Sequence, residues 1–153
     1  MVSLILALSY LGFIGIGLPD SLLGSGWPVM HVQLGADFSY AGIVTMIGAS
    51  STIVASLLSD RVTRRFGTGL AVSTGLLVAA AAMFGFSMST SFWMICLFAA
   101  PYGLAGGTID AALNNYIARH FSSRHMSWLH SFWGLGAIIS PYIMSYSLAS
   151  GLG

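Results

Sequence analysis

Charged residues are almost absent from this chain, and lysine and glutamate are missing altogether. Its 153 residues include five arginines and four aspartates, so that only 6% are charged, whereas soluble domains carry about 25%. The net charge of +1 gives no indication of a nucleic-acid partner. With 56% hydrophobic residues, the composition excludes a soluble domain and indicates a membrane protein.

Cysteine is nearly absent too. The single Cys96 excludes an intrachain disulfide and a metal site built from several cysteines. The sequence also has no nucleophile–base pair with an orienting third group, no metal-ligand cluster and no nucleotide-binding loop. We therefore expect neither an enzyme nor a bound metal or cofactor. The N-terminus lacks a basic segment and a small-residue cleavage site, which predicts a retained helix and not a signal peptide.

The charged residues divide the sequence into apolar segments, each long enough to cross a hydrocarbon core of about 30 Å. The charge-free stretch 66–109 is too long for one crossing, and its polar run at 87–91 predicts a break. We expect an all-α transmembrane helical bundle with five spanning helices, at about residues 3–31, 38–59, 68–87, 91–118 and 126–150. Short basic loops would then occupy 60–67 and 119–125.

The arginines predict the orientation of this bundle. All of them fall in the two basic loops, which lie on the same side of a five-span bundle: Arg61, Arg64, Arg65, Arg119 and Arg124. The positive-inside rule assigns that side to the cytoplasm. We therefore expect an integral protein of the cytoplasmic (inner) membrane, with the N-terminus inside and the C-terminus, as given, outside.

A carboxylate lies inside the first apolar segment. Asp20 is the only charged residue in positions 1–36, and ionisation there is costly unless the group is paired or hydrated. Pro19 cannot donate an amide hydrogen bond and predicts a kink beside the acid. Helical spacing puts Trp27 on the face of Asp20. We predict proton coupling for Asp20 and substrate contact for Trp27; the alternative for Asp20 is a protonated side chain bonded to a neighbouring helix.

The sequence around Asp20 recurs in the fourth predicted helix. Residues 17–23 and 107–113 both follow the pattern G-x-x-D-small-x-L, on helices that cross in opposite directions. This match predicts an inverted repeat of three plus three helices with its site residues at matching positions. A sixth helix would then be missing from the chain.

Three further polar residues are candidates for the site. Asp110 shares a helix face with Asn114, and we predict proton coupling and substrate binding for Asp110 and substrate binding for Asn114. His130, on the fifth predicted helix, can donate, accept or titrate and is a third candidate substrate contact. The alternatives are a helix–helix hydrogen-bond network for Asp110 and Asn114, and a headgroup-facing side chain for His130.

The first basic loop resembles a known signature. The sequence Ser56-x-Leu58-x-Asp60-Arg61-x-Thr63-Arg64-Arg65 is similar to the G-x-L-x-D-R-x-G-R-R motif between helices 2 and 3 of the major facilitator superfamily, with two glycines replaced. The resemblance implies the N-terminal half of a twelve-helix transporter, here residues 1–153, with its sixth helix and C-terminal half absent. It also implies cytoplasmic charge contacts that hold one transporter state, made by Asp60, Arg61, Arg64 and Arg65.

Within that superfamily the chain is most similar to the L-fucose permease group of sugar–proton symporters. The similarity rests on three pieces of sequence: Asp20 followed by Ser-Leu-Leu, Asp110 with Asn114 after it, and the segment LHSFWGLGAII that begins at residue 129. It implies that Asp20 and Asp110 are the coupling acids and that Asn114 and His130 contact the sugar. In that group an amide residue replaces His130 and a glutamate replaces Asp110.

The expected function is therefore proton-coupled symport of a sugar or similar small polar solute. The expected partners are the solute, protons, the lipid bilayer and a missing C-terminal half or complementary chain. One alternative is a drug or metabolite antiporter, because Gly136-x-x-x-Ser140-Pro141 resembles part of the glycine–proline motif of drug–proton antiporters. Another is a non-transporting, truncated membrane fragment, because one repeat lacks its third helix.

Overall fold

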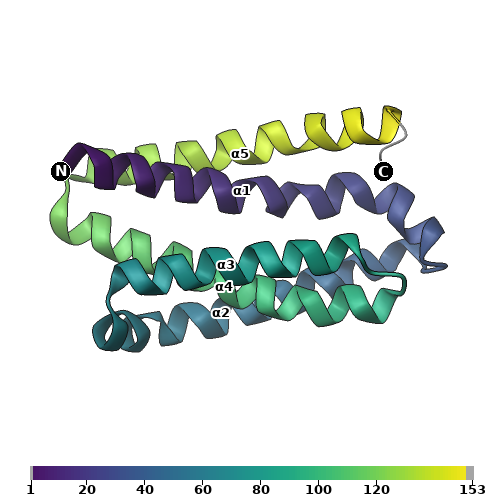
Figure 1. Cartoon of the computed structure of the whole chain (residues 1–153), viewed down its shortest axis with the longest axis horizontal. Helices are drawn as coiled ribbons and strands as arrows, with labels where there is room; N and C mark the ends of the chain where they lie inside the picture. Colours follow the sequence, from purple (N-terminus) through teal and green to yellow (C-terminus); the bar gives the residue numbers. More distant parts are fainter. Residues whose placement is uncertain (1, 151–153) are drawn as a thin grey trace.

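The computed structural model describes residues 2–150 (Figure 1). These residues form five long helices and one short 3-10 turn, η1, at Phe38–Tyr40, and they contain no strand. The five helices are α1 (Val2–Gln33), α2 (Ala41–Phe66), α3 (Thr68–Ser87), α4 (Phe92–His120) and α5 (Ser123–Ala149).

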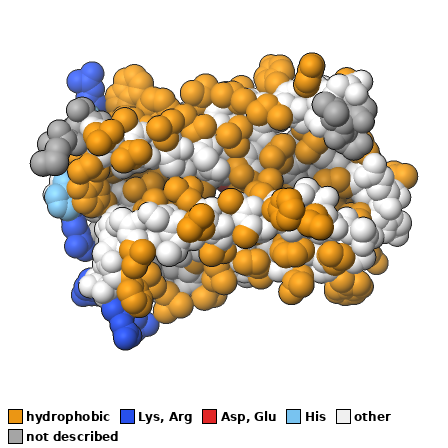
Figure 2. Space-filling view, in the orientation of Figure 1, with side chains coloured by type: hydrophobic (Ala, Val, Ile, Leu, Met, Phe, Trp, Pro, Cys, Tyr) orange, Lys and Arg blue, Asp and Glu red, His pale blue; other side chains and the backbone are white. Residues whose placement is uncertain are grey.

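Four of these helical segments are long and apolar enough to span a membrane: Leu4–Gln33, Phe38–Phe66, Thr68–Ser87 and Phe92–His120. Helix α5 has 27 residues but is less apolar and is not among the four. Many large apolar side chains on all five helices point outward, as Figure 2 shows for one face. This exposure fits a protein whose surroundings are lipid.

The expected basic loops are wrong, because both segments are mostly helical. Helix α2 continues to Phe66, and only Gly67, with φ of 84°, separates it from α3. Helix α4 ends at His120 and α5 begins at Ser123. Charged residues mark where a chain leaves the hydrocarbon, but helical hydrogen bonds continue until the backbone turns. At the end of α2 that turn requires a residue that tolerates positive φ, which glycine does.

The connection between α1 and α2 has its own local signals. Gly35 adopts φ of 60° just beyond the end of α1, a position at which glycine commonly ends a helix. Asp37 then caps η1, accepting hydrogen bonds from the hydroxyl of Ser39 at 2.6 Å and its amide at 2.8 Å. These hydrogen bonds lower the pKa of the Asp37 carboxyl below its usual value, so this carboxyl is ionised at neutral pH.

The helices pack in two groups. Helix α1 lies along α5, and α4 packs against both α2 and α3 (Figure 1). Helix α1 continues through Pro19 and Pro28 without interruption. Contact between the two groups is much less extensive than contact within them.

Two apolar cores join the groups, one toward each end of α1. The first combines Phe13 and Ile16 of α1 with residues of α4 and α5. The second is built around Trp27 of α1 and residues of α2 and α4. Asp20 lies on α1 between these two cores, near the middle of the helix.

Glycines permit the closest helix crossings. A Cβ atom on Gly17 of α1 would overlap the backbone carbonyl of Trp133 on α5, and one on Gly107 of α4 would overlap the carbonyl of Thr52 on α2. Helices in lipid associate through such close approaches of small residues. Both glycines precede an aspartate by three positions, so the crossing fixes the height of each acid against its neighbouring helix.

The Gly107→Ala substitution should therefore destabilise the bundle. Its methyl group would meet the backbone of Thr52, which cannot move aside as a flexible side chain can, and overpacking of this kind costs about 1–3 kcal/mol. The matched control is Gly106→Ala in the same helix, where nothing lies within 4 Å. Thermal unfolding in detergent should show a loss of stability for the first variant only. Equal unfolding temperatures for the two variants would contradict the close crossing.

Candidate functional site

Asp20 is the point at which side chains from three helices meet. The hydroxyl of Tyr102, on α4, donates to one carboxylate oxygen of Asp20 at 2.8 Å. The indole Nε1 of Trp133, on α5, donates to the other oxygen at 3.0 Å. Within residues 2–150 the carboxylate forms no ion pair. Two neutral donors therefore hold the Asp20 carboxylate. The residue is nevertheless exposed, so the carboxylate stays accessible.

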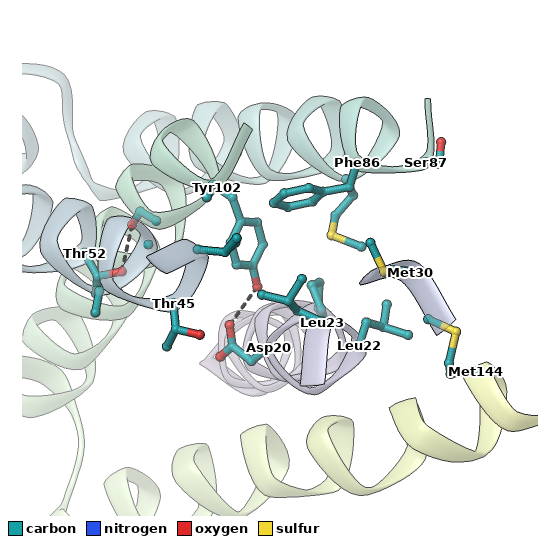
Figure 3. Close-up of a pocket in the computed structure, with 17 residues that line it drawn as sticks. Asp20, Leu22, Leu23, Met30, Thr45, Thr52, Phe86, Ser87, Tyr102 and Met144 are labelled. Atoms are coloured by element: carbon teal, nitrogen blue, oxygen red, sulfur yellow. Dashed lines mark hydrogen bonds between the residues drawn. The ribbon is translucent and has the colours of Figure 1, made fainter. Parts of the chain in front are cut away.

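A cavity of about 470 Å³ opens beside this carboxylate (Figure 3). Its wall comes mainly from α1, α2 and α4, with the end of α3 and Met144 of α5 closing one side. Apart from Asp20, its polar side chains are hydroxyls. The polar, aromatic and sulfur-containing residues of the lining are Asp20, Met30, Thr45, Thr52, Met83, Phe86, Ser87, Tyr102 and Met144.

Tyr102 has a second acceptor within reach. Its hydroxyl lies 3.4 Å from the backbone carbonyl oxygen of Ile16, one turn before Asp20 on α1. Among the side chains of the described residues, Tyr102 is the one on α2, α3 or α4 that hydrogen-bonds to helix α1. It therefore connects the two helix groups at the level of the acid.

Asp110 and Asn114 form a separate polar pair. The amide nitrogen of Asn114 donates to Asp110 at 3.0 Å, as their spacing on one helix face suggests. The amide oxygen of Asn114 is buried and has no hydrogen-bond partner in the described part of the chain. Neither residue lines the cavity beside Asp20.

His130 belongs to the neighbourhood of this second pair. Its ring stands edge-on to Phe13 with 5.7 Å between the ring centroids, and its side chain is exposed. Phe13 packs in the first apolar core with Ile109 and Leu113, which are the sequence neighbours of Asp110 and Asn114 on α4. Asp110, Asn114 and His130 thus share one region, while Asp20 faces the cavity with Tyr102.

Trp27 lies in an apolar core, whereas the helix face that it shares with Asp20 predicts contact with substrate. Its side chain is 2% exposed in the second apolar core, and its Nε1 donates to the carbonyl of Phe38 at 2.8 Å. The ring therefore ties the end of α1 to the following turn, and it does not line the cavity. We leave Trp27 out of the proposed site for this reason.

The charged signature lies at the ends of helices and not in a loop. Asp60 pairs with Arg64 one turn later on α2 and lies 3.8 Å from Arg119 at the end of α4. Arg61 and Arg65 are exposed on the same stretch of α2 and form no ion pair in the described chain. Asp60 therefore connects the ends of two helices.

Three residues of these clusters cannot be identified as partners from the sequence. Tyr102 and Trp133 bind Asp20 across sequence separations of 82 and 113 residues, and Arg119 reaches Asp60 from another helix. Single-helix spacing carries no signal of such contacts. The G-x-x-D pattern is the available hint, because its glycine brings the backbone of Trp133 against α1.

A bundle of long apolar helices with an accessible carboxylate between two cores, beside a cavity, has the features of a membrane transporter. The family model described as Major Facilitator Superfamily matches residues 9–152. The chain therefore belongs to the Major Facilitator Superfamily, a family of membrane transporters and not of enzymes. As an integral membrane protein of this family, it serves the transport of a small solute across a bilayer. No curated protein matches the sequence.

The assignment of Trp27 to a packing role can be tested by stability. Trp27→Phe removes the hydrogen bond to Phe38 and part of a buried ring, so unfolding should require at least about 1 kcal/mol less. Trp93→Phe is the control, because Trp93 is 77% exposed and its replacement should change stability by less than about 0.5 kcal/mol. Chemical unfolding in micelles measures both. A Trp27→Phe variant as stable as the control would make Trp27 a candidate solute contact again.

Proposed function

We propose that the chain is the N-terminal half of a proton-coupled symporter for a sugar or similar polar solute, and that Asp20 carries the coupled proton. The observation that carries this proposal is the Asp20 carboxylate, which is accessible from a cavity at mid-helix and bonded to two neutral donors without a cationic partner in the described chain. An acid in the middle of a membrane-spanning helix, without a compensating charge, is suited to carrying a proton.

The two donors to Asp20 differ in a way that supplies a switch. Ionised Asp20 only accepts hydrogen bonds and can satisfy Tyr102 and Trp133 together. Protonated Asp20 keeps one accepting oxygen and gains a donor, whereas an indole N–H can only donate. Trp133 therefore keeps the accepting oxygen. The Tyr102 hydroxyl oxygen can then accept a hydrogen bond from the protonated carboxyl. Its own O–H can donate instead to the Ile16 carbonyl oxygen, 3.4 Å away.

This exchange would couple the proton to the position of the helices. Tyr102 belongs to the group of α2, α3 and α4, whereas Asp20 and Trp133 belong to the pair of α1 and α5. Protonation replaces a charge-assisted hydrogen bond between the groups by neutral ones, which are about half as strong. The two groups can then shift relative to each other at lower cost. A solute that binds one arrangement better than the other becomes linked to the proton through this difference.

The solute would be bound by Trp133, which contacts Asp20, and by the separate polar region of Asp110, Asn114 and His130. The Trp133 side chain is 40% exposed, and an exposed indole face can pack on the apolar face of a sugar. Asp110, Asn114 and His130 would supply hydrogen bonds to its hydroxyls, with Asp110 also able to hold a proton. The buried amide oxygen of Asn114 that lacks a partner in the described chain is a free acceptor for a hydroxyl. This assignment is consistent with the L-fucose permease group.

The packing supports a 3+3 repeat within a five-span arrangement. Helix α1 packs along α5 as α4 packs along α2, and each of the two matching glycines, Gly17 and Gly107, lies at a close backbone approach in its crossing. Helix α3 covers α4, and we propose that a sixth helix covers α1 in the same way. With the arginine-bearing end in the cytoplasm of an inner membrane, the N-terminus would be inside.

An antiporter is the second candidate, and the cavity lining favours it. Three methionines and Phe86 line the cavity together with the single carboxylate, and thioethers adapt to apolar ligands of different shapes. A lipophilic cation could pair with Asp20 in exchange for its proton. Uptake driven by an inward proton gradient indicates the symporter, whereas proton-driven expulsion of an organic cation indicates the antiporter.

Asp20→Asn should separate solute binding from proton coupling in the full-length transporter. The amide keeps the shape of the side chain and an accepting oxygen but cannot release a proton. Gradient-driven accumulation of solute in vesicles should be lost, while exchange of labelled solute between the two sides continues. Tyr102→Phe should still exchange solute but accumulate less of it for the same proton gradient, because the hydrogen-bond partner of Asp20 on α4 is gone. Accumulation by Asp20→Asn equal to that of the unmodified transporter would eliminate Asp20 as the coupling acid.

A further inference from the structure

The arginines gather at one end of the bundle and leave an excess of positive charge there. Figure 2 shows the arginine side chains confined to the end at which α1 begins. Of the four aspartates, Asp60 alone is at this end, since Asp37 caps η1 at the other and Asp20 and Asp110 lie inside helices. One carboxylate therefore faces five guanidinium groups in this part of the described chain.

A small cavity of about 80 Å³ lies within this positive end. It is bounded by the last turns of α2 and α4 and the first residue of α3, and its lining consists of Thr63, Arg64, Thr68, Asn115, Tyr116, Arg119 and His120. Each of these side chains has a polar group. All of their charges are positive, and hydroxyl and amide groups supply further hydrogen-bond donors.

His120 is held in a fixed position at the cavity. Its ring stacks on Tyr116 with 4.4 Å between centroids, and its Nδ1 lies 2.9 Å from the Tyr116 carbonyl oxygen. A carbonyl oxygen only accepts, so Nδ1 carries the proton of that hydrogen bond. The other ring nitrogen, Nε2, is thereby left for a ligand, and in the cationic ring it is a donor.

The charges around the cavity do not balance. Asp60 pairs with both Arg64 and Arg119, so one carboxylate serves two guanidinium groups and one positive charge is left over. Thr68 begins α3, whose first turn has no side-chain cap in the described chain, and the free N–H groups of a first turn add to the attraction for an anion.

The cavity lies at the level where phospholipid headgroups are found. The apolar segment Phe38–Phe66 and helix α4 each have 29 residues, or about 44 Å of helix, whereas the hydrocarbon core is about 30 Å thick. Their ends therefore reach into the headgroup layer. Phe66 ends α2 and Leu70 follows Thr68 by two residues in α3, and they are 56% and 54% exposed, so this end of the bundle also offers apolar side chains to acyl chains.

We propose that this cavity binds the phosphate of an anionic phospholipid, with Arg119, His120 and Thr68 as its contacts and the acyl chains along Phe66 and Leu70. The lipid phosphate neutralises the charge that Asp60 leaves unpaired. It would thereby hold the ends of α2, α3 and α4 together. This site is independent of the solute and of the proton proposed for Asp20.

Lipid titrations followed by native mass spectrometry test the site on the purified chain in micelles. The probes are POPG, which is anionic, and POPC, which is zwitterionic and has the same acyl chains. The first POPG should bind more tightly than the first POPC. Arg119→Gln should lower the affinity for that first POPG about fivefold, which is the effect of one basic residue near a membrane surface. Arg124→Gln is the matched control, because it removes one charge from the same end but does not line the cavity, and it should leave the first POPG unchanged.

A second variant and a competitor distinguish a built lipid site from surface charge and from a free-anion site. Thr68→Val keeps every charge and should still lower the affinity for the first POPG about two- to tenfold, because one hydrogen bond is lost. With this second variant the test does not depend on whether Arg119→Gln folds. Equal weakening by Arg119→Gln and Arg124→Gln would mean attraction to the general surface charge and would overturn the site. Displacement of POPG by millimolar inorganic phosphate would show that the cavity takes a free anion, and it would equally overturn the lipid proposal.

Discussion

The contact between Gly17 and the backbone of Trp133 determines how the candidate site is assembled. Because Gly17 has no side chain, the carbonyl of Trp133 lies directly against α1, and the indole of the same residue then reaches Asp20 almost one turn further along. In lipid, helices gain no hydrophobic stabilisation from meeting each other, so close backbone approach supplies much of their association. The site depends on this approach, since a wider spacing of α1 and α5 would leave one carboxylate oxygen without its donor.

The two acids share a sequence pattern but have acquired different surroundings. Asp20 is bonded by side chains of two other helices and borders the large cavity, whereas Asp110 is bonded by Asn114 of its own helix. The difference arises because Tyr102 of α4 reaches α1, and no described side chain of α1 reaches Asp110 in return. The same sequence pattern thus occurs with one acid that contacts other helices and with another that has a local polar contact.

The sequence predicts the elements that depend on composition and on spacing within one helix. The apolar segments, the position of Asp20 inside one of them and the pair of Asp110 with Asn114 follow from such signals, whereas the family is indicated by the resemblance of residues 56–65 to a known motif. The helix ends near Asp60 do not follow from such signals, because polarity marks the membrane boundary while a glycine at residue 67 ends the helix. Helical spacing predicts Trp27 in the site because it shares a face with Asp20, but a helix face can pass from a cavity to a core within two turns. The partners Tyr102 and Trp133 depend on tertiary packing, which no local pattern contains.

The most direct test of this account is the indole Nε1–H signal of Trp133 in a ¹⁵N-labelled sample of the chain in micelles, assigned by its loss in Trp133→Phe. This signal reports the hydrogen bond to Asp20 itself and requires no transport. The account predicts that this signal shifts between the unmodified chain and Asp20→Asn at the same pH, while the signal of Trp93, which is exposed, is unchanged. A Trp133 signal that is identical in the unmodified chain and in Asp20→Asn at every pH would contradict it.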